Sequence, residues 1–241
     1  MAKVEQAKHL NLNPQIKVFA VLYVLYAGFA WLTFQLTHHR LHMALAWNLF
    51  LAFLPLLFST FVGRPKQKKW TTILWLILWL LFFPNAIYVI TDVIHLGELS
   101  FYGGRFYEVS RVVYVRDIAI WCELVTTIAG VFLALIMGLL SLLNIHKFLL
   151  KHMSKMRVWL MIGGFSLISS CAIFIGRFLR FNSWDVVAKP WRTMTQFFQN
   201  LDAFALAYIG LITFFTLFIY VIFYQLIKGI VKCCVKSHQN I

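Results

Sequence analysis

Charged side chains are scarce in this sequence, and acidic ones are the scarcest. Asp, Glu, Lys and Arg make up 12% of the 241 residues, with 8 acidic against 22 basic side chains. Soluble domains carry about 25% charged residues. This deficit excludes an ordinary water-soluble domain, because too few polar side chains remain to cover its surface.

Cysteine is also rare, which excludes a small secreted fold stabilised by several disulfides. Of the 4 cysteines, Cys122 and Cys171 fall in apolar segments, and Cys233 and Cys234 are adjacent in a basic tail. We therefore expect free thiols. Residues 1–15 are polar, and the apolar run that follows is too long for a signal peptide and lacks a small-residue cleavage site. We expect no cleavable signal.

Long apolar runs are what the sequence has instead. Hydrophobic residues make up 61% of the chain and arrive in runs rather than in alternation. This pattern predicts an all-α, polytopic membrane protein, with residues 1–241 forming a single membrane domain of about six transmembrane helices. The expected spans are residues 16–36, 44–62, 70–91, 121–143, 158–179 and 204–227. The expected outer loops are residues 92–120 and 180–203.

The distribution of basic residues predicts the orientation. Alternate segments, starting with the N-terminal one, hold thirteen: Lys3, Lys8, Arg64, Lys66, Lys68, Lys69, Lys147, Lys151, Lys155, Arg157, Lys228, Lys232 and Lys236. The opposite segments hold seven: Arg40, Arg105, Arg111, Arg116, Arg180, Lys189 and Arg192. Cytoplasmic segments are enriched in Lys and Arg, so both termini are expected in the cytoplasm of a cell with this protein in its plasma membrane.

The formal net charge of +14 could also suggest a nucleic-acid partner. The basic side chains lie in short clusters between apolar runs, which is typical of a topology signal. We expect a lipid bilayer as the partner and no nucleic acid. Apart from Glu5, every acidic residue falls in or close to an outer segment: Asp92, Glu98, Glu108, Asp117, Glu123, Asp185 and Asp202. Any chemistry is therefore expected on the outer side.

The first candidate site closes the third apolar run. Asn85, Tyr88, Asp92 and His95 follow one another at intervals of three, four and three residues, which places them on one face of a helix. Asp92 and His95 could form a catalytic acid–base pair or bind a divalent metal together. The alternative is a carboxylate–imidazole pair that ties a loop down.

Pro84 precedes this face and removes one backbone hydrogen bond of the helix. The carbonyl freed near Leu80 needs a donor, which Asn85 or a neighbouring helix could supply. Irregular backbone at this depth is tolerated only where protein or a water-filled cavity covers it. The Pro-Asn pair therefore predicts a polar pocket or, alternatively, a kink that packing exploits.

The second candidate lies at the outer end of the fifth span. Arg177 and Arg180 are one helical turn apart and could clamp an anionic or phosphate-bearing substrate. Anchoring to lipid headgroups is the alternative reading. Four residues follow as further candidates for binding a substrate: Asn182, Ser183, Trp184 and Asp185. Asn182 or Ser183 could cap a short helix that begins near Trp184.

The third candidate is Glu123, which is costly near the start of a span unless it is paired. We expect it at the same outer level as Asn48, a buried amide that needs partners. Below Glu123 runs a stripe of small residues suited to close helix packing. Its members are Thr127, Gly130, Ala134, Gly138 and Ser141.

Two weaker patterns complete the outer side. His38, His39 and His42 have spacings that could bind a metal, or they are solvated loop residues. Farther along, one helical face predicts an amphipathic helix in the outer interface. That face consists of Trp191, Met194, Phe198, Leu201 and Ala205.

Three segments resemble the signature blocks of one bacterial family of membrane proteins, domain of unknown function 1361. They are Asn48–Pro55, Phe83–Leu96 and Gly176–Asp185. The likeness extends over roughly residues 44–225 and is weaker around Glu123. It implies a multi-pass bacterial membrane protein and no known activity.

Three functions stay open. An accessory, assembly or binding role is favoured, with a protein partner or an anionic substrate at the outer face. The alternatives are a membrane-embedded enzyme acting on an anionic or phosphate-bearing substrate and a transporter of small solutes or ions. For the enzyme, Asp92, His95 and Glu123 would be catalytic, while Asn48, Asn85, Tyr88 and the 177–185 set would bind the substrate. Seven of these residues are predicted to converge at one outer level: Asn48, Asn85, Asp92, Glu123, Arg177, Asn182 and Asp185.

Overall fold

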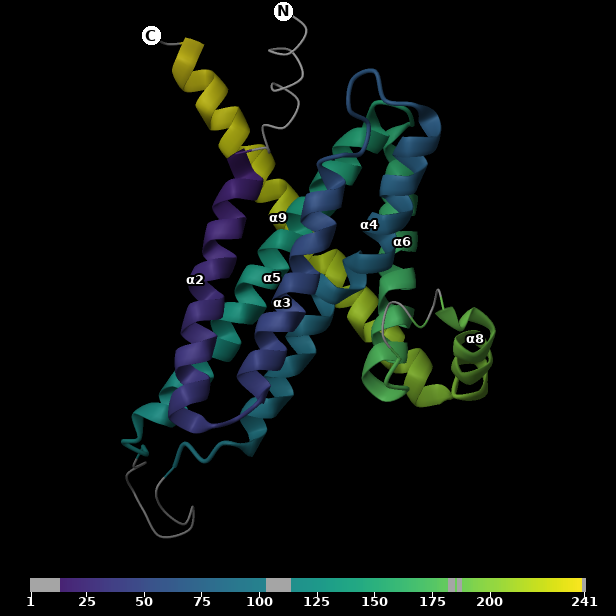
Figure 1. Ribbon diagram of the computed structural model, residues 1–241. Helices are drawn as coiled ribbons and strands as arrows, with labels where there is room; N and C mark the ends of the chain where they lie inside the picture. The colour runs from purple at the N-terminus through teal and green to yellow at the C-terminus, as the bar shows by residue number, and fades with distance from the viewer. Residues whose placement is uncertain (1–13, 103–113, 182–184, 186–187, 240–241) are drawn as a thin grey trace, which may run out of the picture.

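The computed structural model describes residues 14–102, 114–181, 185 and 188–239, and in these ranges the protein is all-α (Figure 1). No strand occurs in the described ranges; a single antiparallel bridge pairs Tyr102 with Tyr114. The long helices are α2 (Pro14–Thr37), α3 (Leu41–Ser59), α4 (Lys69–Tyr88), α5 (Ile118–Leu150), α6 (Lys155–Phe178) and α9 (Ala203–Gln239). The short elements are the 3₁₀ helix η2 (Val89–Glu98) and the helix α8 (Pro190–Gln199).

Six segments of the described chain are long and apolar enough to cross a membrane, which confirms the predicted all-α, six-span architecture. The segments are Pro14–Thr37, Leu41–Ser59, Lys69–Glu98, Ile118–Leu150, Lys155–Phe178 and Ala203–Cys233. Their boundaries differ from the expected ones mainly where polar residues extend a helix beyond its apolar part. Helix α5, for example, starts at an Asp117 cap, whose carboxylate accepts a hydrogen bond from Ala119 N at 2.9 Å.

Helix α2 begins and α9 ends at the same end of the bundle (Figure 1). We call this end the inner end, in keeping with the predicted orientation, and the opposite end the outer end. The outer end holds the turn between α2 and α3, the 3₁₀ helix η2, the start of α5 and the short helix α8.

Helix α5 is the centre of the bundle and contacts α2, α3, α4, η2, α6 and α9. Its stripe of small residues is buried, as predicted. A Cβ atom built on Gly138 would lie 2.8 Å from Ala86 Cβ, and one built on Gly130 would overlap the Tyr26 side chain. The absence of side chains at these two positions is what lets α4 and α2 approach α5.

Polar side chains on α5 also tie the inner half of the bundle together. Ser141 Oγ accepts a hydrogen bond from Trp79 Nε1 at 3.1 Å. Farther in, His146 Nδ1 lies 2.7 Å from the Tyr220 hydroxyl, and its ring stacks on Tyr224 with centroids 4.9 Å apart. These contacts connect α5 to α4 and α9.

The third span does not end at residue 91 as expected, because the helix continues as η2 to Glu98. A 3₁₀ helix has three residues per turn, so Val89, Asp92, His95 and Glu98 lie on one face. Val89 and Asp92 are buried, and the face becomes progressively exposed toward Glu98. A 3₁₀ helix of ten residues is unusually long, and burial of this face stabilises it.

The amphipathic outer helix is present as α8, but it is shorter than the predicted face. It starts at Pro190, a favourable first position, and Trp191 and Phe198 are exposed. It ends at Gln199 because Asp202 caps a new helix, with its carboxylate accepting from Ala205 N at 2.8 Å. The predicted continuation of the face through Leu201 and Ala205 is therefore wrong.

Substituting Gly138 tests the close approach of α4 and α5. We expect Gly138→Ala to lower the free energy of unfolding by about 1–3 kcal/mol, because the new methyl group overlaps Ala86. Gly28→Ala is the control, since nothing lies within 4 Å of a Cβ atom built there. Thermal unfolding in detergent measures both. Equal stability of the two variants would contradict this packing.

Candidate functional site

A buried ion pair joins the fifth span to the outer end of the third. Arg177 Nη2 donates to Asp92 Oδ1 at 2.6 Å. The other carboxylate oxygen, Oδ2, accepts from Asn48 Nδ2 at 2.9 Å. The Asp92 side chain is only 4% exposed and that of Arg177 21%. Three helical elements, α3, η2 and α6, thus meet at one carboxylate.

Two neighbours on the third span complete the surroundings of Arg177. Its Nε donates to Thr91 Oγ1 at 2.9 Å, and its Nη2 also contacts that oxygen. Thr91 Oγ1 in turn donates to the Tyr88 carbonyl at 2.7 Å. The guanidinium lies over the Tyr88 ring, 4.5 Å from its centroid, in cation–π geometry. We call Asn48, Tyr88, Thr91, Asp92 and Arg177 the outer network.

The outer network is internally balanced. One positive and one negative charge face each other, and both Asp92 oxygens accept hydrogen bonds. A lone charge at this depth would be very costly, whereas a paired and hydrogen-bonded one is tolerated. The arrangement therefore acts as a joint between helices.

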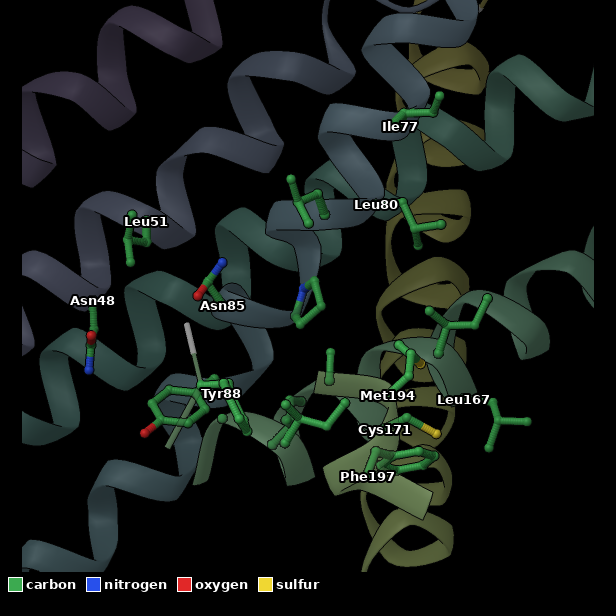
Figure 2. A pocket seen from close by; sticks show the side chains of 18 of the residues that line it. Asn48, Leu51, Ile77, Leu80, Asn85, Tyr88, Leu167, Cys171, Met194 and Phe197 are labelled. Carbon is green, nitrogen blue, oxygen red and sulfur yellow. The ribbon is translucent and has the colours of Figure 1, made fainter. Parts of the chain in front are cut away.

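A cavity of about 580 Å³ lies directly beside the outer network (Figure 2). Residues of α3, α4, α6 and α8 line it. Three polar side chains line it, those of Asn48, Asn85 and Tyr88, and Figure 2 shows them on one side of the space. The remaining wall is almost entirely apolar, with Leu167, Cys171, Met194 and Phe197 on the other side.

Pro84 and Asn85 are both part of this cavity wall. Asn85 Nδ2 donates to the Phe82 carbonyl at 3.1 Å. The pocket expected beside the Pro-Asn pair is thus present, but it is mainly apolar instead of polar. It combines a small polar patch with a large hydrophobic surface.

The cavity lies in the outer half of the bundle, and part of its apolar lining is exposed. Its α6 wall runs from Leu167 to Gly176, a rise of about 14 Å at ~1.5 Å per residue. That is about half of a ~30 Å hydrocarbon core. Four of its apolar lining residues are about half exposed: Trp47 at 52%, Ile77 at 58%, Leu167 at 48% and Ile168 at 51%. An apolar molecule could enter from the side.

Glu123 belongs to a different cluster. Its carboxylate, 7% exposed, lies 3.3 Å from His39 Nδ1 and 3.8 Å from His42 Nε2. His42 is fully buried, and neither ring nitrogen has a hydrogen bond within the described residues. Of the residues predicted to converge, Asn48, Asp92 and Arg177 meet. Glu123 instead contacts His39 in the turn between α2 and α3 and His42 in α3.

Asp92 and His95 do not form the expected pair. His95 Nδ1 faces Glu98 Oε1 at 3.7 Å, since both lie on the outer part of the 3₁₀ face, while Asp92 is turned toward Arg177. No group of three or more His, Cys, Asp or Glu side chains in the described ranges is arranged to hold a metal ion. Metal binding by Asp92 and His95, or by the histidines before α3, stays a prediction.

The predicted set after Arg177 is only partly described. Arg180 is exposed and has a positive φ of 58°, so it lies beyond the end of α6. The Asp185 carbonyl accepts from Lys189 N at 2.8 Å and thereby holds the turn before α8. Asn182, Ser183 and Trp184 lie outside the described residues.

Sequence reasoning missed Thr91, the partners of Glu123 and the contribution of α8 to the cavity. The signal for Thr91 was its position next to Asp92 in a span that ends in polar residues. The signal for His39 and His42 was that a buried carboxylate needs a cation or donor at its own level. Periodicity could not show that Met194 and Phe197 line a cavity, because only the tertiary fold brings α8 to α6.

Comparison with known proteins identifies a family but no characterised relative. The family described as "Protein of unknown function (DUF1361)" matches residues 47–222, which is more than half of the chain. Neither the curated proteins nor the solved structures contain a significant match.

Removing either charge of the buried pair tests the outer network. We expect Asp92→Ala and Arg177→Ala each to cost about 3–5 kcal/mol of unfolding free energy, because each leaves its partner buried and uncompensated. The double variant Asp92→Asn with Arg177→Gln should cost less than the sum of the matching single variants. Arg180→Ala, at an exposed position, is the control, with an expected change within ~0.5 kcal/mol. Additive losses in the thermal unfolding of these variants would show that the pair is not coupled.

Proposed function

The chain belongs to the DUF1361 family, whose function is unknown, and from the geometry of its own site we propose that it binds an amphiphilic lipid without catalysing a reaction. The apolar part of the lipid occupies the cavity between α3, α4, α6 and α8. Its polar head lies against Asn48, Asn85 and Tyr88. The single observation that carries this proposal is an apolar cavity with one polar side, open toward lipid.

The dimensions of the cavity support a ligand of this class. Sites for small molecules typically measure about 300–1,000 Å³ and combine an apolar lining with a few polar groups. The volume of about 580 Å³ falls within that range. Its half-exposed apolar lining would face the hydrocarbon core, where lipids are the abundant molecules that match such a surface.

The contacts of the outer network favour binding over catalysis. A general acid or base must reach a substrate, but both Asp92 oxygens are engaged by Arg177 and Asn48. Neither Asp92 nor Arg177 lines the cavity. Their position behind Tyr88 suits residues that hold the cavity wall in place.

We further propose that the membrane is the plasma membrane of a bacterial cell, with both termini in the cytoplasm. The excess of basic residues in the inner segments, thirteen against seven, supports this orientation. In this orientation the cavity opens to the outer leaflet, and an accessory or assembly role would be exerted there.

Filling the cavity should prevent lipid binding. We expect Ala172→Trp, in the α6 wall, to weaken binding about tenfold or more, that is by ~1.4 kcal/mol or more. Leu160→Trp is the matched control, because it places the same side chain on the same helix at a lipid-facing position outside the lining. Native mass spectrometry of the protein purified in mild detergent measures the bound lipid. Equal occupancy in the two variants would refute the proposed site.

Thiol labelling tests the orientation. Cys233 on α9 and Tyr102 at the outer end are both exposed. In a variant with Cys122, Cys171 and Cys234 replaced by Ser, a membrane-impermeant maleimide should label Cys233 only after the cells are opened. A Tyr102→Cys variant that also lacks Cys233 should be labelled in intact cells. The reverse labelling pattern would show that the protein has the opposite orientation in the membrane.

A further inference from the structure

The charges around the cavity limit which lipid it can hold. We propose that the ligand has an uncharged, hydroxyl-bearing head, as a diacylglycerol has, rather than a phosphate head. This inference rests on the proposed lipid-binding function and adds the chemistry of the headgroup.

The groups that line the polar side of the cavity are neutral. They are two side-chain amides and a phenol, from Asn48, Asn85 and Tyr88. Amides and phenols donate and accept hydrogen bonds, which matches hydroxyl and ester groups. No Asp, Glu, Lys, Arg or His is among the described residues that line the cavity.

Arg177 lies next to this polar side, over the Tyr88 ring. It is already paired with Asp92 and hydrogen-bonded to Thr91. The Asp92 carboxylate, which is 4% exposed, already balances the charge of Arg177. A phosphate beside Arg177 would therefore lie close to a buried negative charge that repels it.

Other basic residues of the outer end are placed differently. Arg180 and Arg192 are exposed, and Lys189 immediately precedes α8; none of the three lines the cavity. They can meet the headgroups of the surrounding bilayer. A phosphate held deep in the cavity would remain without a cation, whereas a hydroxyl would not need one.

The size and opening of the cavity agree with a lipid of two chains. The α6 wall extends over about 14 Å, which is shorter than the ~30 Å core and long enough for part of a chain. Because Trp47, Ile77 and Ile168 are half exposed at the lining, the rest of the molecule can extend into the bilayer.

The test compares two lipids that differ only in the phosphate. Full-length protein in detergent is titrated with dioleoylglycerol and, separately, with dioleoyl phosphatidic acid, and native mass spectrometry gives the two dissociation constants. We expect dioleoylglycerol to bind about tenfold more tightly or better. We expect Tyr88→Phe, which keeps the ring beneath Arg177 but removes the hydroxyl, to weaken dioleoylglycerol binding severalfold. Tyr23→Phe, on α2 and outside the lining, is the control.

The possible results separate the two proposals. Tighter binding of phosphatidic acid, lost in Ala172→Trp, would overturn the neutral head while leaving the lipid cavity intact. Binding of both lipids that Ala172→Trp does not change, or no binding of either, would overturn both proposals. A preference for dioleoylglycerol that Tyr88→Phe leaves unchanged would overturn the assignment of the head to Tyr88.

Discussion

The pairing of Arg177 with Asp92 is the interaction on which the outer half of this protein depends. Each residue sits in a segment that is otherwise apolar, and each would be very costly there alone. Pairing them requires α6 to lie beside η2, and the hydrogen bond from Asn48 brings α3 to the same point. Non-directional packing of leucine and phenylalanine could not impose that relation. Two charges and an amide therefore fix the helices that enclose the cavity.

The outer end contains two polar clusters, and this division follows from the central helix. Glu123 near the start of α5 faces His39 in the turn after α2 and His42 in the first turn of α3, while Asp92 faces α6. Between α5 and its neighbours the side chains are small, so α2 and α4 pack close to it. Each carboxylate thus pairs with side chains of the helices and turns that pack next to it. One cluster connects α2, α3 and α5, and the other connects α3, η2 and α6.

The helices were predictable and the partners of the polar residues were not, for a physical reason. A run of twenty apolar residues has few alternatives to a membrane-spanning helix, because every backbone polar group must be satisfied within the segment. The predicted topology also placed Asn48, Asp92 and Arg177 at one level of the bundle, and the structure brings them into contact. Helical spacing placed Asp92 and His95 on one face. The same spacing suggested that His95 is the partner of Asp92. That was wrong, because Arg177 and Asn48, which are distant in sequence, bind the carboxylate instead. Periodicity describes one helix at a time, so it could place neither Glu123 beside His42 nor Phe197 in the cavity wall.

A cavity of this size also constrains what the protein does in its membrane. Its wall is almost entirely apolar and part of that wall is exposed, so the cavity suits an apolar occupant rather than water. On the proposed function, lipid occupies the cavity in the stable state of the protein. The ion pair of Arg177 and Asp92 lies outside the lining, and the polar groups in the lining are neutral, so we expect the headgroup to be selected by hydrogen bonding rather than by charge.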